Sequence, residues 1–366
     1  MGIKDMFMVK GGDFMRKILI CAFVFLWLFS MSIVGLSGAW AENAEAIKNM
    51  IGRMDVGEPV HYENLTIIPL YSARVTDHTP YTTLEQALEN NRLKITEIDG
   101  GQVPTVKLTN LSDKYIFIMG GEILTGCKQD RIIGRDVLIK PGSKHVVVPV
   151  YCVEQGRWTY QSKDFYSKNN LGTPDLRAEA QTGSSAAQGK IWDKISRVSA
   201  GLDVQSTTNS YQAIYEDKNV KDRIMTIEQK MGSIPHLFPD TIGVIVGVGG
   251  KIISVDIFAS PFLFQQLWPK IIKASAMSAV TMEITGNLTQ EDAVKFLRKL
   301  HNNDYLQRPA IDLGFEYFFA DKLLSVNSLI FRNVVIHLAG FPQQEDKAEQ
   351  RRKNNDQERR IPVIRR

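Results

Sequence analysis

The chain has 366 residues, of which 44% are hydrophobic and 23% are charged. This is an ordinary globular composition, long enough for one large domain or two small ones. The net charge of +4 comes from the ends: residues 1–41 carry +2 and residues 345–366 carry +3, which leaves the body at about −1. The basic balance therefore gives no reason to expect a nucleic-acid partner.

The N-terminal segment has the pattern of a secretory signal. Arg16 and Lys17 precede an uncharged apolar run from Ile18 to Leu36, and an Ala-x-Ala sequence follows at Ala39–Ala41. We expect a signal peptide over residues 1–41, cleaved after Ala41, and a periplasmic or extracellular mature protein. Because the apolar run is long for a signal core, an uncleaved membrane anchor stays open.

A second start is compatible with the same segment. Met15 can itself open a compact signal peptide, and the preceding residues 10–13 (Lys-Gly-Gly-Asp) can be encoded by a purine-rich ribosome-binding sequence read in frame. These observations favour Met15 as the start and a bacterial source.

The first half of the body is mostly extended. Runs rich in Val, Ile and Tyr predict strands at Leu65–Tyr71, Thr105–Thr109, Tyr115–Met119, Val137–Ile139 and His145–Val153. One helix interrupts them, because residues 82–85 (Thr-Thr-Leu-Glu) form a capping-box sequence that opens a helix through about residue 90.

The second half alternates helices with a hairpin. Residues 169–190 are rich in Gly, Ser, Ala and Gln, which predicts a long, exposed and mobile loop. Helical spacing of apolar residues predicts one helix over residues 191–202 and a longer one over residues 211–231. Residues 241–259 predict a hairpin with a Gly-rich turn.

Two further helices have clear start signals. Ser260 followed by Pro261 opens one, and Thr289 followed by three polar residues opens the other. Strands return over residues 315–338, and residues 343–366 form a charged tail that we expect to be disordered.

These elements predict a single α+β domain over residues 55–342. Its N-terminal half is rich in mostly antiparallel strands, and its C-terminal half has a helix-hairpin-helix order. The histidines are scattered without ligand spacing, and no glycine-rich stretch stands between a strand and a helix, so we expect neither a metal nor a cofactor.

Two polar phrases follow apolar strands. The first is GGEILTGCKQDR (residues 120–131) and the second is VPVYCVEQGRW (residues 148–158). In the second, strand periodicity places Cys152 and Glu154 on the same face as two valines. An arginine fork beside an aromatic ring suits a phosphate or carboxylate, and paired glycines can bring backbone amides close to a ligand.

The two phrases supply the candidate site, if they meet at one rim. Glu122 and Glu154 are the candidate acid and base. The candidate ligand-binding residues are Gly120, Gly121, Gln129, Asp130, Arg131, Arg157 and Trp158. The alternative is that the carboxylates pair with the arginines as an internal brace, since structural ion pairs also concentrate charge.

Three states stay open for the two cysteines of the body. Cys127 and Cys152 can form a disulfide in an oxidising compartment, Cys152 can be a buried inert thiol, or it can be a nucleophile. Sequence does not supply the Cα separation that decides the first case.

The same phrases resemble a known family. GGEILTGCKQDRIIGRDVLIKP (residues 120–141), VPVYCVEQGRW and GGKIISVDIFASPFLFQQLWPKII (residues 249–272) are similar to the ARG and Rhodanese-Phosphatase-superfamily-associated protein domain. So are WDKI (residues 192–195) and QSTTNS (residues 205–210). Cys127 stands where the family pattern has glycine, which speaks against a role for that thiol. With ARG read as ADP-ribosylglycohydrolase, the resemblance implies an uncharacterised domain linked to ADP-ribose and phosphate chemistry.

The first hypothesis is an exported protein whose polar cleft binds a phosphorylated or nucleotide-derived small molecule, such as an ADP-ribose-like compound. The second is a hydrolase that uses Glu122 and Glu154 as acid and base. The third is a non-catalytic envelope module that binds protein partners. Contact with a membrane is expected only through an uncleaved signal segment.

The export hypothesis predicts the N-terminus of the mature protein. When the full chain is expressed in a bacterial host, N-terminal sequencing of the periplasmic or secreted form should begin at Glu42, because signal peptidases cut after Ala-x-Ala. A mature form that retains residue 20 would contradict cleavage.

Overall fold

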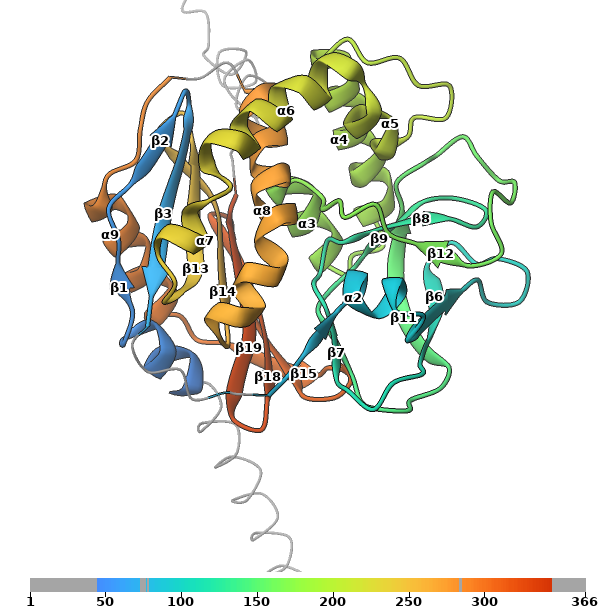
Figure 1. Cartoon of the computed structure of the whole chain (residues 1–366), viewed down its shortest axis with the longest axis horizontal. Coiled ribbons are helices and arrows are strands. Elements are labelled where there is room, and N and C mark those ends of the chain that lie inside the picture. Colours follow the sequence, from blue (N-terminus) through green and yellow to red (C-terminus); the bar gives the residue numbers. More distant parts are fainter. Residues whose placement is uncertain (1–44, 73–76, 78, 283–284, 344–366) are drawn as a thin grey trace, which may run out of the picture.

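The computed structural model describes residues 45–72, 77, 79–282 and 285–343. The expected signal segment and residues 344–366 of the expected tail lie outside the described residues. The described residues form three β-sheets and a set of helices, arranged in two halves that pack against each other (Figure 1). The α+β class and the β-rich first half are confirmed.

The largest sheet contains strands from both ends of the described chain. Its order is β1-β3-β13-β14-β19-β18-β17-β15, with β2 beside β3, and all of these pairs are antiparallel. The strands are β1 (Asp55–Val56), β2 (Val60–Tyr62), β3 (Leu65–Tyr71), β13 (Thr241–Val248), β14 (Lys251–Phe258), β15 (Leu306–Pro309), β17 (Phe315–Ala320), β18 (Leu324–Phe331) and β19 (Val334–Pro342). The expected hairpin is confirmed as β13 and β14.

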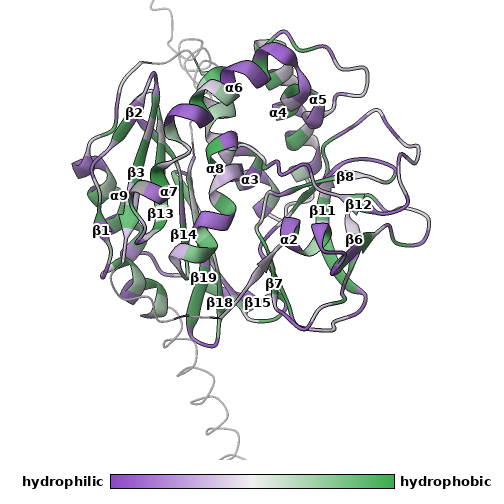
Figure 2. Ribbon diagram, in the orientation of Figure 1, coloured by the Kyte–Doolittle hydropathy of each residue, from purple (hydrophilic) through white to green (hydrophobic). Residues whose placement is uncertain are grey.

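Both faces of this sheet are covered by helices. Ile67 and Val244 belong to the core that contains α8 (Pro261–Thr281), whereas their neighbours Ile68 and Ile245 belong to the core that contains α9 (Gln290–His301). Strands buried on both faces read as continuous apolar runs, which explains the hydrophobic colour of the central strands in Figure 2.

Two smaller sheets form the β-rich half. One has the order β12-β8-β9-β11-β6-β5 and the other has the order β16-β10-β7-β4. The strands are β4 (Thr82–Thr83), β5 (Leu93–Thr96), β6 (Thr105–Asn110), β7 (Ile116–Ile118), β8 (Ile123–Gly126), β9 (Arg131–Ile133), β10 (Val137–Ile139), β11 (Val146–Cys152), β12 (Phe165–Tyr166) and β16 (Ile311–Asp312). β16 comes from the C-terminal half and pairs in parallel with β10.

The remaining helices connect and cover the two halves. They are α2 (Leu84–Glu89), α3 (Pro174–Gln181), α4 (Ala187–Gly201), α5 (Tyr211–Glu216), α6 (Lys218–Met231) and α7 (Ile234–Leu237). Figure 1 shows α8 between the nine-stranded sheet and the β-rich half. The predicted starts of α8 and α9 are confirmed, because the Ser260 and Thr289 hydroxyls accept hydrogen bonds from backbone amides of the first turn.

The prediction of a loop over residues 169–190 is wrong. Pro174 begins α3, which buries Leu176 and Ala180, and α4 already begins at residue 187. A proline at the first helical position was the signal in the sequence, since its fixed φ suits a helix start.

Two helix boundaries also differ from prediction. The helix expected over residues 211–231 is interrupted at Asp217, whose ψ of 131° is extended and whose carboxylate caps α6 by accepting from the Val220 amide. The capping box of α2 uses Thr83 and Gln86, one residue later than the sequence indicated.

A closed ring of buried contacts joins the two halves. Arg177 donates to both carboxylate oxygens of Asp256 and to the Gly120 carbonyl. His337 contacts Asp256 Oδ1 through Nε2 at 3.1 Å and Asp136 Oδ2 through Nδ1 at 2.7 Å. Asp136 closes the ring by accepting from the Gly120 amide at 2.7 Å. All four side chains are buried.

The ring determines the protonation of its members. Burial alone would lower the pKa of His337, but the carboxylates of Asp136 and Asp256 outweigh burial and raise that pKa to about 9. Burial likewise opposes the charge of Asp256, but Arg177 and His337 hold the pKa of this carboxyl well below its usual range. His337 is therefore a cation at neutral pH.

The stability of the protein should decrease in mild alkali. A histidine whose folded pKa lies near 9, against an ordinary 6.5, contributes stability that is fully present below pH 6.5 and lost as the pH rises through about 9. In urea titrations, the free energy of unfolding should fall between pH 7 and about 10 more steeply than in the variant His337→Gln. The exposed-site control His236→Gln should keep the parental profile. Identical slopes in the parent and His337→Gln would contradict the assignment.

Candidate functional site

The two polar phrases lie side by side in the six-stranded sheet. Strands β8, β9 and β11 are neighbours, so Arg131 pairs with Leu124 on one side and with Cys152 on the other. The predicted alternation along the second phrase is also present, since Val148, Val150 and Cys152 are buried. What the sequence left open is whether these residues face a ligand or one another.

Arg157 is enclosed by its own protein. Its guanidinium donates to Glu154 Oε2 at 2.7 Å, to Asp130 Oδ1 at 3.0 Å and to the Cys127 carbonyl at 2.7 Å. Arg157, Glu154 and Asp130 are each less than 10% exposed. Glu154 also accepts from the Thr208 hydroxyl. With its donors used, this cluster is an internal brace and leaves no free fork for an anion.

Glu122 faces a different partner. It accepts from the Met119 amide and forms a short ion pair with Lys270 of α8, which also pairs with Glu85 of α2. Burial raises the pKa of Glu122 to about 7, although Lys270 acts in the opposite direction. Glu122 and Glu154 share no partner, so the predicted acid and base are not brought together.

Gly120 and Gly121 serve packing between the halves. A Cβ on Gly121, whose φ is +103°, would lie 2.3 Å from the Arg177 Cγ. A Cβ on Gly120 would lie 3.0 Å from the backbone of Arg135. The glycine pair therefore lets Arg177 reach Asp256, which explains its presence without a ligand.

The other predicted ligand-binding residues do not converge on one site. Arg131 is fully buried and donates to Gln129 Oε1 at 3.1 Å, while Gln129 donates to the Glu154 carbonyl. Trp158 is 47% exposed, and its ring lies 4.9 Å from the Lys128 ammonium instead of beside the Arg157 guanidinium. The expected combination of arginine fork and aromatic plane is not formed.

The two cysteines of the body are both free and buried. Burial raises the pKa of Cys127 to about 12 and also raises the pKa of Cys152. A thiol with a raised pKa is a poor nucleophile at neutral pH, so the inert state fits Cys152.

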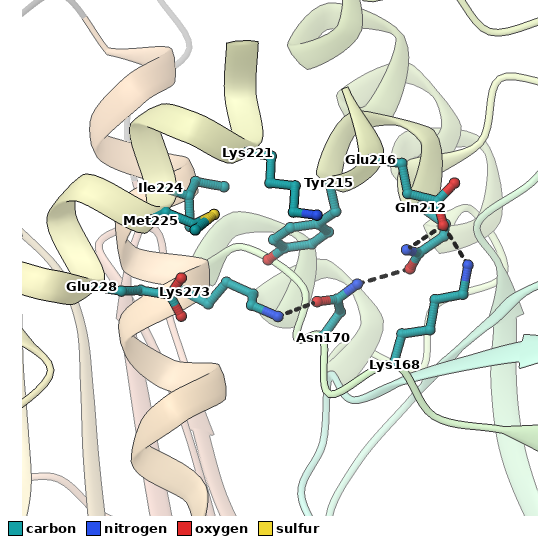
Figure 3. A pocket seen from close by; sticks show the side chains of 10 residues that line it. All are labelled: Lys168, Asn170, Gln212, Tyr215, Glu216, Lys221, Ile224, Met225, Glu228 and Lys273. Carbon is teal, nitrogen blue, oxygen red and sulfur yellow. Dashed lines mark hydrogen bonds and ion pairs between the residues drawn. The ribbon is translucent and has the colours of Figure 1, made fainter. Parts of the chain in front are cut away.

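A pocket of about 410 Å³ opens elsewhere, at the junction of α5, α6 and α8 with the segment after β12 (Figure 3). We call it the lysine pocket. Its lining residues are Lys168, Asn170, Gln212, Tyr215, Glu216, Lys221, Ile224, Met225, Glu228 and Lys273. The α6 members recur every three or four positions, so they lie on one face of the helix.

A chain of polar contacts crosses this pocket. Lys273 Nζ donates to Asn170 Oδ1 at 3.0 Å, Asn170 Nδ2 donates to Gln212 Oε1 at 2.8 Å, and Gln212 Nε2 donates to Glu216 Oε1 at 3.1 Å. Lys168 completes the chain through a short ion pair with Glu216. The chain fixes the orientation of both amides, and Figure 3 shows these side chains converging.

Lys273 and Glu228, which both line the lysine pocket, have pKa values that are shifted toward each other. Burial lowers the pKa of Lys273. The charge of Glu228 raises this pKa, and the charge of Lys270 lowers it further. Burial raises the pKa of Glu228, while Lys273 acts in the opposite direction. An amine and a carboxyl whose pKa values approach each other are typical of functional sites.

The lysine pocket is not among the sites predicted from the sequence. Lys221 and Glu228 resemble an ordinary solvated helix face. The available signal was in α8, where Lys270 and Lys273 stand three residues apart in an otherwise largely apolar helix. A buried lysine needs a partner, so such a pair indicates a polar site beside the helix.

In the described ranges, no three His, Cys, Asp or Glu side chains gather in a way that could hold a metal ion. Within the same ranges, no helix combines the length and the apolar character that a bilayer crossing requires.

The brace predicts a stability effect at Arg157. Arg157→Ala leaves Glu154 and Asp130 as uncompensated buried carboxylates, and the free energy of unfolding should fall by roughly 3–5 kcal/mol. The half-exposed neighbour provides a control, since Trp158→Ala removes mainly a surface contact with Lys128 and should lower the free energy of unfolding by only about 1 kcal/mol. Equal unfolding curves for both variants in denaturant titration would show that Arg157 is not a brace.

Searches of curated proteins and of solved structures found no match. A family profile matches residues 53–341, which is most of the chain and nearly all of its described part. The chain belongs to the family described as the ARG and Rhodanese-Phosphatase-superfamily-associated Protein domain.

Proposed function

We propose that this protein binds a small anionic molecule, of the phosphorylated or nucleotide-derived class, in the lysine pocket. The observation that carries the proposal is the convergence of Lys168, Lys221 and Lys273 on one pocket that contains only two carboxylates. Ammonium groups are point-charge donors that suit phosphate oxygens. The family description, which names a phosphatase superfamily, is compatible with such a ligand.

Lys221 is the lysine best placed to meet an incoming anion. Lys168 is engaged by Glu216, and Lys273 is engaged by Asn170. The Lys221 side chain is exposed and makes no hydrogen bond or ion pair within the described part of the chain, whereas its backbone amide donates to the Asp217 carbonyl. An anion bound beside it would gain a charge-assisted contact without displacing an existing one.

The pocket also offers recognition beyond charge. The Tyr215 ring lies on its wall, with Lys273 Nζ at 5.9 Å from the ring centroid, and Ile224 and Met225 add apolar surface. A volume of about 410 Å³ falls within the ordinary range for small-molecule sites. These features favour a sugar phosphate or a nucleoside monophosphate, or one end of an ADP-ribose-like compound.

The other two hypotheses receive less support from the geometry. A hydrolase built on Glu122 and Glu154 needs both carboxylates at one substrate, but neither lines the lysine pocket. A protein-binding module needs no convergence of lysines in a hollow. Export remains part of the proposal through the N-terminal sequence alone.

Binding should depend on Lys221. By isothermal titration calorimetry with the full chain, ribose 5-phosphate, AMP and ADP-ribose are the probes, with inorganic phosphate as the minimal one. At least one should bind, with affinity that falls as salt rises, since ions screen exposed charges. Lys221→Ala should weaken binding by roughly tenfold, which equals about 1.4 kcal/mol.

Lys230 gives the matched control, because it is an exposed lysine of α6 outside the pocket. Lys230→Ala should bind like the parent. The proposal fails if none of the four probes binds, or if Lys221→Ala and Lys230→Ala bind alike.

A further inference from the structure

A second hollow, of about 570 Å³, lies in the β-rich half. It is formed by β5, the residues just after β5, and the loop that leads into β12, and it shares no residue with the lysine pocket. Its principal side chains are Lys94, Glu97, Tyr160, Lys163 and Asp164. We call it the tyrosine hollow.

Glu97 has an unsatisfied oxygen in this hollow. Its side chain is only 5% exposed. Oε1 accepts from the Lys128 amide at 3.2 Å, whereas Oε2 is buried and has no hydrogen-bond donor among the described residues. Leaving a buried carboxylate oxygen without a hydrogen-bond donor costs free energy. A donor from outside the chain would therefore stabilise Glu97 Oε2.

The charge of Glu97 is nevertheless balanced. Arg131 is fully buried behind it, with Nη2 at 4.0 Å from Glu97 Oε1. Two of its nitrogens, Nε and Nη2, make no hydrogen bond within the described ranges. Since the guanidinium already supplies the positive charge, Oε2 needs a neutral donor, such as a hydroxyl, and not a second cation.

The second carboxylate of the hollow also has a cationic partner. Lys94 lies 3.8 Å from Asp164, and Lys163 is the remaining charged side chain of the lining. Asp164 Oδ1 is a second buried oxygen without a hydrogen bond. Because both carboxylates already have cationic partners, their remaining lone pairs suit neutral hydroxyl donors, and selectivity in this hollow would come from hydroxyl recognition and shape.

An aromatic platform borders the hollow. Tyr160 is 56% exposed and lines it, and Trp158 is 47% exposed nearby. The Lys128 ammonium lies 5.2 Å from the Tyr160 ring centroid and 4.9 Å from that of Trp158, which holds the two rings around one cation. Exposed rings offer flat apolar contact at low conformational cost.

We propose that the tyrosine hollow binds a neutral saccharide. A pyranose presents an apolar C–H face, which stacks on the Tyr160 ring, and an edge of hydroxyls, one of which donates to Glu97 Oε2. This combination of a ring face and buried carboxylate acceptors matches a sugar better than a flat base, because a base has no row of hydroxyl donors. The site is independent of the lysine pocket.

Saturation-transfer NMR on the full chain provides the test. The probes are the methyl glycosides of glucose, galactose and N-acetylglucosamine and the disaccharides cellobiose and maltose, with adenine as a flat-ring comparator that has no hydroxyl. At least one saccharide should receive saturation, strongest on the C–H protons of one face. Tyr160→Ala should weaken its binding by roughly tenfold, or about 1.4 kcal/mol.

Tyr166→Ala is the matched control, because Tyr166 is also exposed and lies outside the hollow. Tyr166→Ala should bind sugars like the parent. Lys221→Ala should do so as well, so the result does not depend on whether the lysine pocket binds an anion. Glu97→Gln should also weaken binding, and if that variant does not fold, Tyr160→Ala alone decides. The proposal is overturned if adenine alone receives saturation, if no probe receives it, or if the saccharides receive it equally from the parent and from Tyr160→Ala.

Discussion

The ring of contacts through Asp136, Arg177, Asp256 and His337 is the interaction on which the two-part architecture depends. It ties α3, two strands of the nine-stranded sheet and the β-rich half at one buried point. Removing four ionisable groups from water is tolerated only when their charges balance and their hydrogen bonds are matched. Two carboxylates need two positive charges; Arg177 supplies one, and a proton on His337 supplies the other. The halves are therefore assembled with a bound proton as one of their components.

Lys270 forms a second set of buried ion pairs, and these position the lysine pocket. Its pairs with Glu122 and Glu85 fix the rotation of α8 against the β-rich half. One turn further on, Lys273 is consequently directed at Asn170, whose own segment is held to the first phrase by the Ile123 amide. The polar phrases thus position the walls of the pocket without lining it. The charged residues of the two phrases hold the fold together, which is why the phrases resemble a ligand site when the sequence is considered without the structure.

The sequence predicted most strands and helix starts because those signals are local. Apolar runs such as Leu65–Tyr71 and caps such as Ser260 need no knowledge of the rest of the chain. The partners of Glu122 could not be predicted in the same way, since Lys270 is far away in sequence and a salt bridge leaves no pattern in either segment. Local reading also could not distinguish a paired arginine from a free one, and Arg157 was paired within its own phrase and with Asp130. The lysine pocket could not be predicted from the sequence because its walls come from three helices whose packing depends on tertiary contacts.

The arrangement of strands has a consequence for how the chain reaches its native state. β3 lies between β1 and β13, although Tyr71 and its partner Thr241 are separated by the whole β-rich half. The β-rich half in turn receives β16, at Ile311–Asp312, as an edge strand. Each half thus includes a strand that is encoded on the far side of the other half. Pairing between strands so distant in sequence slows folding. The four-stranded sheet and the nine-stranded sheet are therefore completed only after most of the chain has been synthesised.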